Sequence, residues 1–529
     1  MKIRGAISFL AFLFITLSGF AQQHFDILIK NGEIIDGTGT ARFKGDVGII
    51  KDKIASIGDL SGSTADSVLD ASGLIVAPGF IDVHTHIEGD EAKTPTADNF
   101  IYDGVTSVIT GNCGSSRLDI QHYFDTLKLV KLSINVGTLM GHNDIRTKVM
   151  GQGDIAPSKG QLKEMEGIVA KGMRDGAMGF STGLEYTPGI YSTTGEIVAL
   201  AKQAAKYHGV YTSHMRNESD HVFDAIAETI DVGRQAKIPV EISHLKVGQP
   251  NWGASSKMLA MIDSARAEGI DVTADVYPYT ASSTTLYILL PDWLKAGGTK
   301  EILKRLSDPA LHQKAVDDMI IDMQRRKRAH FDYAVVASFT PNPALDGKNI
   351  AQINVEAGRA PTIPNEIETI LDMVKLGSAS MVFHSMSEAD VDNILKYPYT
   401  GIISDSGIRT FGEGVPHPRG YGSNARVLAV YVRDKNLITL EDAVRKMTSL
   451  PAEKFHITNR GILQPGKYAD IVIFDAARVK DESTFEHPHA YSTGFKYVLV
   501  NGAITVDNFK HIGTRKGTIL YGPGYKKQI

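Results

Sequence analysis

Between residues 78 and 450, short β-branched runs alternate with stretches of helical character, and this alternation constrains the fold more than any other feature. The segments 160–176 and 193–209, which lie between such runs, predict helices. Eight strand–helix units are typical of the α/β class and of a (β/α)8 barrel of the TIM type, with a doubly wound open sheet as the alternative. The eight runs are 79–86, 105–114, 132–142, 177–184, 210–215, 240–245, 270–279 and 401–407.

The connection between the last two runs, about 120 residues long, exceeds what one crossover needs. Within it, 335–339 and 381–386 resemble extra strands. We therefore expect an inserted subdomain at 292–378, between barrel strands 7 and 8, with 379–400 leading back into the barrel. The basic cluster of this insert is interpreted as a solvated helix face; it comprises Arg325, Arg326, Lys327 and Arg328.

Both ends of the chain are rich in short strands. Residues 25–75 contain β-branched stretches and the turn dipeptide Asn31-Gly32. Similar β-branched stretches occur near the C-terminus, at 469–475 and 497–507. The late VLVNG echoes the early ILIKNG, so we predict that the two ends pair into one small β-sandwich. The predicted boundaries are 22–77 and 456–529 for the two parts of the sandwich and 78–455 for the barrel.

Residues 1–21 have the layout of a secretory signal peptide. Lys2 and Arg4 precede an apolar run from Ile7 to Leu17, and small residues lead to a cleavage site after Ala21. The run is about half of the roughly 20 residues that a spanning helix needs, and a retained anchor is the alternative. We expect a periplasmic or secreted chain with no membrane span after cleavage.

The charge balance and the cysteine count exclude two classes of protein. With 56 Lys+Arg against 60 Asp+Glu, the net charge of −4 argues against a general nucleic-acid binder. The single cysteine, Cys113, excludes an internal disulfide framework. In an oxidising compartment, Cys113 is either a buried small apolar residue or a metal-bound thiolate. Nothing in the sequence indicates the oligomeric state.

Six metal-binding or acid–base side chains lie at the ends of the predicted strands. His84 and His86 end the first run as His-Thr-His, and alternate residues of a strand point to the same side. Because the catalytic residues of a barrel come from the carboxyl ends of its strands, we predict that all six side chains meet. The other four end runs two, five, six and eight, and are Cys113, His214, His244 and Asp405.

This ligand set predicts zinc, which suits thiolate and imidazole better than magnesium or calcium does. A site with an open position for water would supply hydroxide near neutral pH, and Asp405 would move the proton to a leaving nitrogen. Other histidines are interpreted as structural or surface residues, including His142, His384 and the second His-x-His at His487 and His489.

The motifs around these residues resemble the amidohydrolase superfamily, in which His84-Thr85-His86 after GFID and a final-strand aspartate are typical. More closely, the chain resembles the N-acyl-D-amino-acid deacylases, with motifs in the family's order over nearly all residues after 21. The motifs are GNCGSS (111–116), GAMGFSTGLEYTPG (176–189), TSHMRNE (212–218), ISHLK (242–246), DVYPYTASSTTL (275–286), PHPRGYG (416–422), GILQPGKYADIVIFD (461–475) and VLVNG (498–502).

The resemblance implies two metal sites. Cys113, His214 and His244 would bind one zinc ion tightly. His84, His86 and Asp405 would form a second, weaker site, with Asp405 as the catalytic residue. The fourth strand lacks the lysine that bridges two metals in many binuclear amidohydrolases, so Cys113 would bridge if two ions bind. Whether turnover needs one ion or two stays open.

The resemblance also implies a site for the free carboxylate of the substrate. By motif position, its residues would be Arg419, Tyr277, Ser283, Lys246 and Tyr186, and Met386 would line the side-chain pocket. Arg419 has independent support, because its planar guanidinium suits a bidentate carboxylate. Packing at the barrel rim is the alternative for Tyr277 and Tyr186, and core packing for Met386.

We therefore expect a zinc-dependent hydrolase that cleaves N-acyl-D-amino acids to a D-amino acid and a carboxylate. One alternative is a cyclic-amide hydrolase of the hydantoinase or dihydroorotase kind, or a D-specific dipeptidase. Another is a non-catalytic binding protein with the amidohydrolase fold. The missing strand-four lysine counts against a cyclic-amide hydrolase, and the six filled ligand positions count against a non-catalytic protein. The sequence does not specify the preferred side chain or acyl group.

Overall fold

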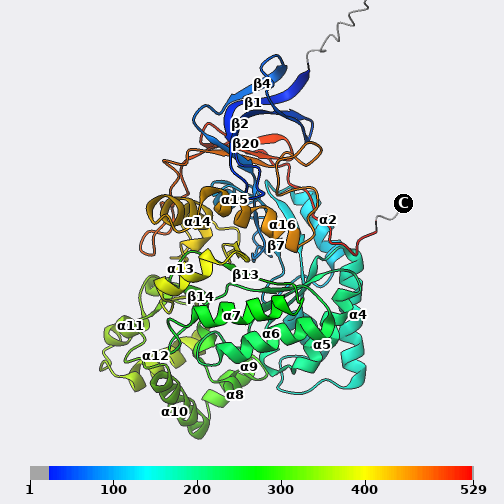
Figure 1. The fold of residues 1–529 in the computed structure, drawn as a ribbon. Coiled ribbons are helices and arrows are strands. Elements are labelled where there is room, and N and C mark those ends of the chain that lie inside the picture. The colour runs from blue at the N-terminus through cyan, green and yellow to red at the C-terminus, as the bar shows by residue number, and fades with distance from the viewer. Residues whose placement is uncertain (1–22, 527–529) are drawn as a thin grey trace, which may run out of the picture.

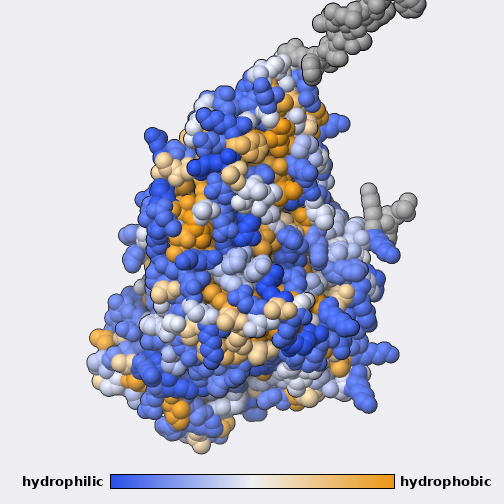
Figure 2. All heavy atoms as spheres, in the orientation of Figure 1, coloured by the Kyte–Doolittle hydropathy of each residue, from blue (hydrophilic) through white to orange (hydrophobic). Residues whose placement is uncertain are grey.

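The computed structural model describes residues 23–526, so the predicted signal peptide at 1–21 lies outside the described residues. Three parts are visible in Figure 1: a sheet domain at the top, a barrel in the middle, and a helical insert at the lower left. Figure 2 shows hydrophobic residues gathered along the sheet domain and its border with the barrel, while hydrophilic residues cover most of the remaining face. Among the described helices, none combines the length and the apolar character needed to cross a membrane.

The barrel is built from parallel strands in chain order, as the alternating pattern predicts. A parallel bridge between Thr85 and Ser406, with a 2.9 Å hydrogen bond from His86 N to Ser406 O, joins the last strand to the first. The strands are β6 (Phe80–Asp82), β7 (Val105–Thr110), β8 (Asn135–Thr138), β9 (Met140–Gly141), β10 (Gly179–Gly183), β11 (Val210–His214), β12 (Val240–Ile242), β13 (Val272–Val276) and β17 (Thr400–Ile402). Consecutive β8 and β9 together fill the third position, since β8 pairs with β7 and β9 with β10.

The two helices predicted between strands are present as α4 (Lys159–Asp175) and α5 (Thr194–Ala205). A capping box begins α4, in which Ser158 Oγ accepts from Gln161 N and the Gln161 side chain accepts from Ser158 N. Gly176, at φ 114°, ends α4 in a backbone region that favours glycine. The other barrel helices are α1 (Asp98–Ile101), α2 (Ile120–Val130), α3 (His142–Met150), η1 (Gly189–Tyr191), α6 (Val222–Ala236), α7 (Ser255–Ala267), α13 (Glu388–Lys396), α14 (Arg419–Arg426), η4 (Val427–Asp434), α15 (Leu440–Met447) and α16 (Ser449–Lys454).

The two ends of the chain pair into one nine-stranded sheet, as their similar strand patterns predict. Buried side chains from both ends share one core, for example Ile29, Val76, Ile473 and Leu499. The order is β21-β20-β19-β18-β5-β1-β2-β3, with β4 beside β1. The bounds are β1 (His24–Ile34), β2 (Phe43–Ile50), β3 (Lys53–Gly58), β4 (Thr64–Asp70), β5 (Ile75–Pro78), β18 (Ile471–Phe474), β19 (Phe495–Val500), β20 (Ala503–Asp507) and β21 (Lys510–His511).

The segment after β21 leaves the sheet and packs on the barrel. Ile519 forms a parallel bridge with Val136, and Leu520 N donates to Val136 O over 2.8 Å. Assigning all of 456–529 to the sheet domain is therefore wrong for this last segment. Two glycines permit the close backbone approach, since a Cβ would meet Ile134 O at 1.9 Å from Gly517 and Ala177 O at 2.1 Å from Gly522.

The insert between β13 and β17 has its own three-stranded antiparallel sheet, in the order β14-β16-β15, and its own apolar core. The predicted bounds, 292–378, are too narrow because they leave out β14 and β16. The β14 sequence SSTT is short and polar, so it lacks the alternation that marks a strand. The insert comprises β14 (Ser282–Thr285), η2 (Leu286–Leu289), α8 (Asp292–Lys295), α9 (Thr299–Leu306), α10 (Pro309–Arg325), β15 (Ala334–Ser338), η3 (Pro343–Leu345), α11 (Ile350–Glu356), α12 (Ile363–Leu376) and β16 (Ser380–Phe383).

Candidate active site

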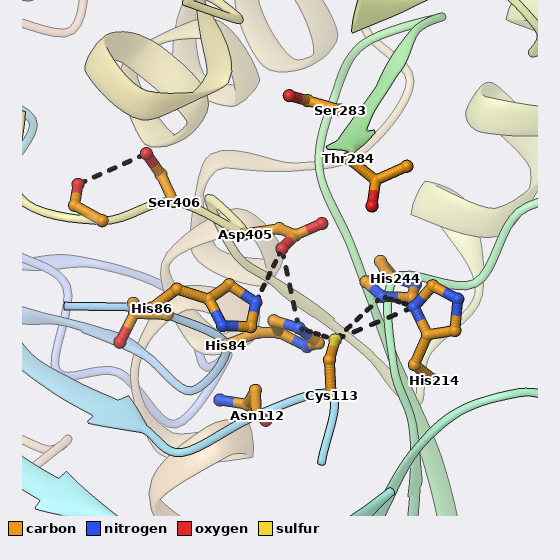
Figure 3. Close-up of polar contacts among 12 residues, drawn as sticks. His84, His86, Asn112, Cys113, His214, His244, Ser283, Thr284, Asp405 and Ser406 are labelled. Atoms are coloured by element: carbon orange, nitrogen blue, oxygen red, sulfur yellow. Dashed lines mark hydrogen bonds and ion pairs between the residues drawn. The ribbon is translucent and has the colours of Figure 1, made fainter. Parts of the chain in front are cut away.

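The six side chains predicted as metal ligands converge at the carboxyl end of the barrel, with Cys113 at their centre (Figure 3). Cys113 Sγ lies 3.3 Å from His84 Nε2, 3.7 Å from His214 Nδ1 and 3.6 Å from His244 Nε2. These four residues come from the ends of β6, β7, β11 and β12. Residues far apart in the sequence therefore meet as the strand-end pattern predicts.

Asp405 lies on the other side of His84. Its Oδ1 is 3.3 Å from His86 Nε2 and 3.7 Å from His84 Nε2. Two adjacent groups result, one formed by Cys113, His214 and His244, the other by His84, His86 and Asp405 (Figure 3). Cys113 Sγ contacts His84 of one group and belongs to the other, so it would be the residue to bridge two ions if both groups held a metal.

Three of these residues adopt left-handed backbone conformations that side-chain-bearing residues rarely visit. The φ angles are 51° at Cys113, 34° at His244 and 49° at Asp405. Such conformations cost about 1–3 kcal/mol each and are concentrated at functional sites. Gly114 supports the turn at Cys113, because a Cβ there would meet Asn143 Oδ1 at 2.5 Å.

Two carboxylates that the sequence did not predict contact the imidazole nitrogens that point away from Cys113. Glu185 Oε2 lies 3.1 Å from His214 Nε2, and Glu218 Oε1 lies 3.0 Å from His244 Nδ1. Glu185 is hydrogen bonded to the His214 ring, and Glu218 lies close enough to accept from His244 Nδ1, which also faces Lys246 Nζ at 2.7 Å. The only sequence signal was position, since Glu185 precedes Tyr186 and Glu218 follows His214 by four residues.

The donor set fits a zinc ion. His214 Nδ1 and His244 Nε2 lie 2.9 Å apart, and both nitrogens face Cys113. When the N–H of each ring faces Glu185 or Glu218, these two nitrogens are free to offer their lone pairs to one ion. A thiol and two imidazoles are ligands that zinc prefers.

The charge states of these groups suit metal binding. Burial lowers the pKa of His84 to about 3 and that of His244 well below its ordinary value, so both rings are neutral and can act as ligands. Burial also raises the pKa of the Cys113 thiol, and a thiolate at this depth requires a cation beside it. Burial alone would raise the pKa of Asp405, but Arg419, with His86 and His84, holds it well below its usual range.

Arg419 lies directly beside the acid–base candidate. Its Nη1 is 2.8 Å from Asp405 Oδ2, and its Nη2 donates to the Ser283 carbonyl over 3.2 Å. The guanidinium carbon lies 4.5 Å from the centre of the Tyr277 ring, and Tyr277 OH lies 3.8 Å from Met386 Sδ. Four of the residues predicted to bind substrate therefore form one continuous wall next to Asp405.

The other two predicted substrate residues are Lys246, whose Nζ lies 5.7 Å from the centre of the Tyr277 ring, and Tyr186. Lys246 Nζ is 2.8 and 2.9 Å from the two oxygens of Glu218, and Tyr186 OH accepts a 3.1 Å hydrogen bond from Thr284. Cys113 and Asp405 line one cavity of about 750 Å³, together with all six predicted substrate residues. His142 lies outside it and pairs with Glu196 over 2.9 Å, in agreement with a structural role.

The basic cluster of the insert is not simply a solvated face. Arg326 and Arg328 line the cavity, since the insert folds over the barrel mouth. Lys327 points into solvent, as the sequence interpretation expects. The interpretation as a solvated helix face is therefore wrong for these two arginines.

Comparison with known proteins agrees with this geometry. Residues 67–312 and 409–506 match the model of the amidohydrolase family. The chain belongs to this family. The amidohydrolase is 37% identical over 504 residues to N-acyl-D-glutamate deacylase of Alcaligenes xylosoxydans xylosoxydans, covering 91% of this chain and 93% of the relative. It is 35% identical to D-aminoacylase of the same organism, covering 94% and 98%.

Among solved structures, this amidohydrolase is similar to N-acyl-D-glutamate deacylase from Bordetella bronchiseptica, in complex with zinc and a phosphonate inhibitor that mimics the tetrahedral intermediate. The TM-score is 0.80 at 34% sequence identity, covering 94% of this chain and all of the other. The expected family and the barrel with an added sheet domain are thus confirmed.

Proposed function

We propose that this amidohydrolase uses zinc to hydrolyse N-acyl-D-amino acids to a D-amino acid and a carboxylate. The ion pair between Arg419 and Asp405 carries the proposal, because it sets a carboxylate-binding guanidinium 2.8 Å from the acid–base group. The names of the two relatives, N-acyl-D-glutamate deacylase and D-aminoacylase, support the same reaction.

We assign the tightly held zinc to Cys113, His214 and His244, with His84, His86 and Asp405 available for a second ion. When bound, zinc supplies a Lewis acid for the acyl carbonyl and lowers the pKa of water. The chain itself holds the three ligand side chains in place around one position. Glu185 and Glu218 contribute to this by orienting the imidazole rings of His214 and His244.

Asp405 moves one proton during the reaction. As a carboxylate it accepts the proton of the attacking water, while the new C–O bond forms. It then donates that proton to the amide nitrogen as the C–N bond breaks, so that the products are a carboxylate and the free amine. Its position between His86 Nε2, at 3.3 Å, and Arg419 fixes the direction of its two oxygens.

Arg419 determines which enantiomer of the substrate is cleaved. A guanidinium that binds the α-carboxylate in a bidentate manner, with Tyr277, Ser283 and Lys246 nearby, fixes one substituent of the chiral carbon. The scissile amide, held at Asp405, fixes the second, and the side-chain pocket at Met386 accepts the third. With three substituents placed, only one enantiomer brings its amide to Asp405.

The assay compares linear and cyclic amides on zinc-loaded protein, with detection of the released amine. We expect N-acetyl-D-amino acids to be cleaved and hydantoins to remain intact. Cleavage of hydantoins alone would replace this proposal with a cyclic-amide hydrolase.

We also propose that the enzyme acts outside the cytoplasm as a signal-peptide-cleaved periplasmic or secreted protein. Support comes from the sequence of residues 1–21, in which a short positive start precedes an apolar run and small residues.

A further inference from the structure

A buried histidine lies next to Arg419, the arginine assigned to the carboxylate of the substrate. His417 precedes Arg419 by two residues in the motif PHPRGYG, and only 1% of its surface is exposed. It lies outside the lining of the active-site cavity, and the proposed zinc binding and proton transfer do not use it. Burying a polar ring is unfavourable unless its nitrogens are hydrogen bonded, so the partners of His417 indicate its role.

Both ring nitrogens of His417 are hydrogen bonded to the backbone. Nδ1 accepts from Arg419 N over 3.0 Å, and Nε2 donates to the Ala281 carbonyl over 2.9 Å. Because a backbone N–H can only donate and a carbonyl can only accept, these partners require a neutral ring with its proton on Nε2. Burial, together with the charge of Arg419, lowers the pKa of His417 well below its ordinary value, so the ring is neutral as the two bonds require.

The bond from Arg419 N fixes the backbone of this arginine. Arg419 is the first residue of α14, and the N-cap residue Pro418 provides no side-chain acceptor for the free N–H groups of the first turn. The His417 ring supplies one instead. Pro416 and Pro418 flank His417 and restrict its own backbone, since proline fixes its φ and disfavours helical conformations in the residue before it. The acceptor for Arg419 N is therefore held in place by its sequence neighbours.

The bond to Ala281 fixes the strand that the Arg419 side chain reaches. Ala281 directly precedes β14, and the carbonyl of Ser283 in that strand accepts a 3.2 Å hydrogen bond from Arg419 Nη2. One ring thus contacts the backbone of Arg419 and the segment that holds the end of its side chain.

Aromatic packing restricts the His417 ring further. Its centroid lies 6.0 Å from that of Tyr277, 5.3 Å from that of Tyr279 and 5.0 Å from that of Phe485. Tyr277 in turn packs on the Arg419 guanidinium, whose carbon lies 4.5 Å from the centre of the tyrosine ring. Displacement of His417 would therefore disturb the backbone of Arg419 and the ring on which its guanidinium packs.

We propose that His417 is a positioning residue for the α-carboxylate of the substrate, and that it acts by fixing Arg419 through its backbone and through β14. The inference rests on the proposed deacylase function and adds a residue to the same site. If His417 positions Arg419, its replacement weakens recognition of the carboxylate, whereas a substrate without this carboxylate is affected much less.

The test uses the N-acetyl-D-amino acid that the wild-type enzyme cleaves best in a panel and the α-carboxamide of the same compound. The ratio of their kcat/KM values measures recognition of the carboxylate, because a general loss of activity or of zinc changes both values equally. Where cleavage of the carboxamide is too slow to measure, the KM of the carboxylate substrate at full zinc loading decides in its place.

Three variants separate the two hydrogen bonds of the ring. His417→Phe keeps an aromatic ring without either bond, so we expect the ratio to fall about 10- to 100-fold, mostly through the KM of the carboxylate substrate. His417→Asn sets an oxygen near the Nδ1 position and can still accept from Arg419 N, so it should keep the ratio within about threefold of the wild type. His417→Gln sets an amide nitrogen near Nε2, keeps only the bond to Ala281, and should give a ratio between the other two.

His384→Phe is the matched control. It makes the same substitution at a ring that also packs on Phe485, at 4.7 Å, but His384 is exposed and lies outside the cavity lining. This variant should leave the ratio and KM unchanged.

An unchanged ratio and KM in folded, zinc-loaded His417→Phe would overturn the proposal, and so would equal losses on both substrates, which would mean a structural role alone. If His417→Phe does not fold, a higher ratio in His417→Asn than in His417→Gln supports the proposal, and equal ratios or the reverse order contradict it. If zinc-loaded wild-type protein cleaves no N-acyl-D-amino acid, the proposed function fails; if it does and the ratio is insensitive to residue 417, this inference alone fails.

Discussion

Replacement of Glu218 by Gln tests whether the carboxylate behind His244 contributes to metal binding. Glu218 receives two hydrogen bonds from Lys246 Nζ, at 2.8 and 2.9 Å, and lies 3.0 Å from His244 Nδ1. Glutamine has the same shape but is neutral, so it cannot offer Lys246 and His244 a charged acceptor, and one of the two carboxylate oxygens becomes an NH2 group. Its amide group would instead place a donor against one of them.

The size of the effect follows from these contacts. A hydrogen bond to a charged group contributes about 1.5–3 kcal/mol, and about 1.4 kcal/mol corresponds to a tenfold change in affinity. Loss of one such bond behind His244 should weaken zinc binding by about 10- to 100-fold, the range typical of carboxylates that support a metal-binding histidine. Excess zinc should restore much of kcat, because the direct ligands are unchanged.

The assay is zinc affinity by competition with a chelator, followed by kcat as a function of free zinc. Glu228→Gln is a matched control: Glu218 and Glu228 are both 14% exposed, and Glu228 pairs with Arg216 at 2.8 Å without touching a ligand histidine. The control should bind zinc like the wild type. Zinc affinity of Glu218→Gln within about twofold of the wild type would refute the reasoning.

Three further predictions concern the ligands, the proton transfer and the N-terminus. Cys113→Ala should lose both zinc and activity, because the sulfur contacts His84, His214 and His244; metal analysis that finds full zinc and full turnover would contradict the assignment. Asp405→Asn should keep the zinc held at Cys113 but lower kcat by about 10²- to 10⁴-fold, the usual contribution of a general acid–base group, and unchanged steady-state kinetics would exclude Asp405 from proton transfer. Protein recovered from an exporting bacterial host should begin at Gln22, and N-terminal sequencing that finds residues 1–21 still attached would oppose cleavage.

The metal ligands were predictable because strand ends in a barrel share one location. His214 is the last residue of β11, and His244 and Asp405 lie two and three residues beyond β12 and β17. Once eight parallel strands are inferred, any polar residue at a strand end points to the same region. No contact information is needed for that step, so periodicity and residue type were sufficient.

The residues that were missed depend on tertiary contacts without a local pattern. Glu185 and Glu218 act through the outer nitrogens of histidines, and nothing in their own sequence neighbourhood requires that role. Arg326 and Arg328 resemble a charged helix end until the insert is folded over the cavity. The strand β14 was not predicted because its sequence, SSTT, has no apolar face. It forms through pairing with β16.

The most direct test of the account is a zinc titration of metal-free enzyme on matched pairs of N-acetyl-D- and N-acetyl-L-amino acids, including the acidic and neutral members. We predict no turnover without metal, activity that rises as zinc fills the site of Cys113, His214 and His244, and cleavage of the D enantiomers only. Full activity in metal-free enzyme, or cleavage of L substrates alone, would contradict it.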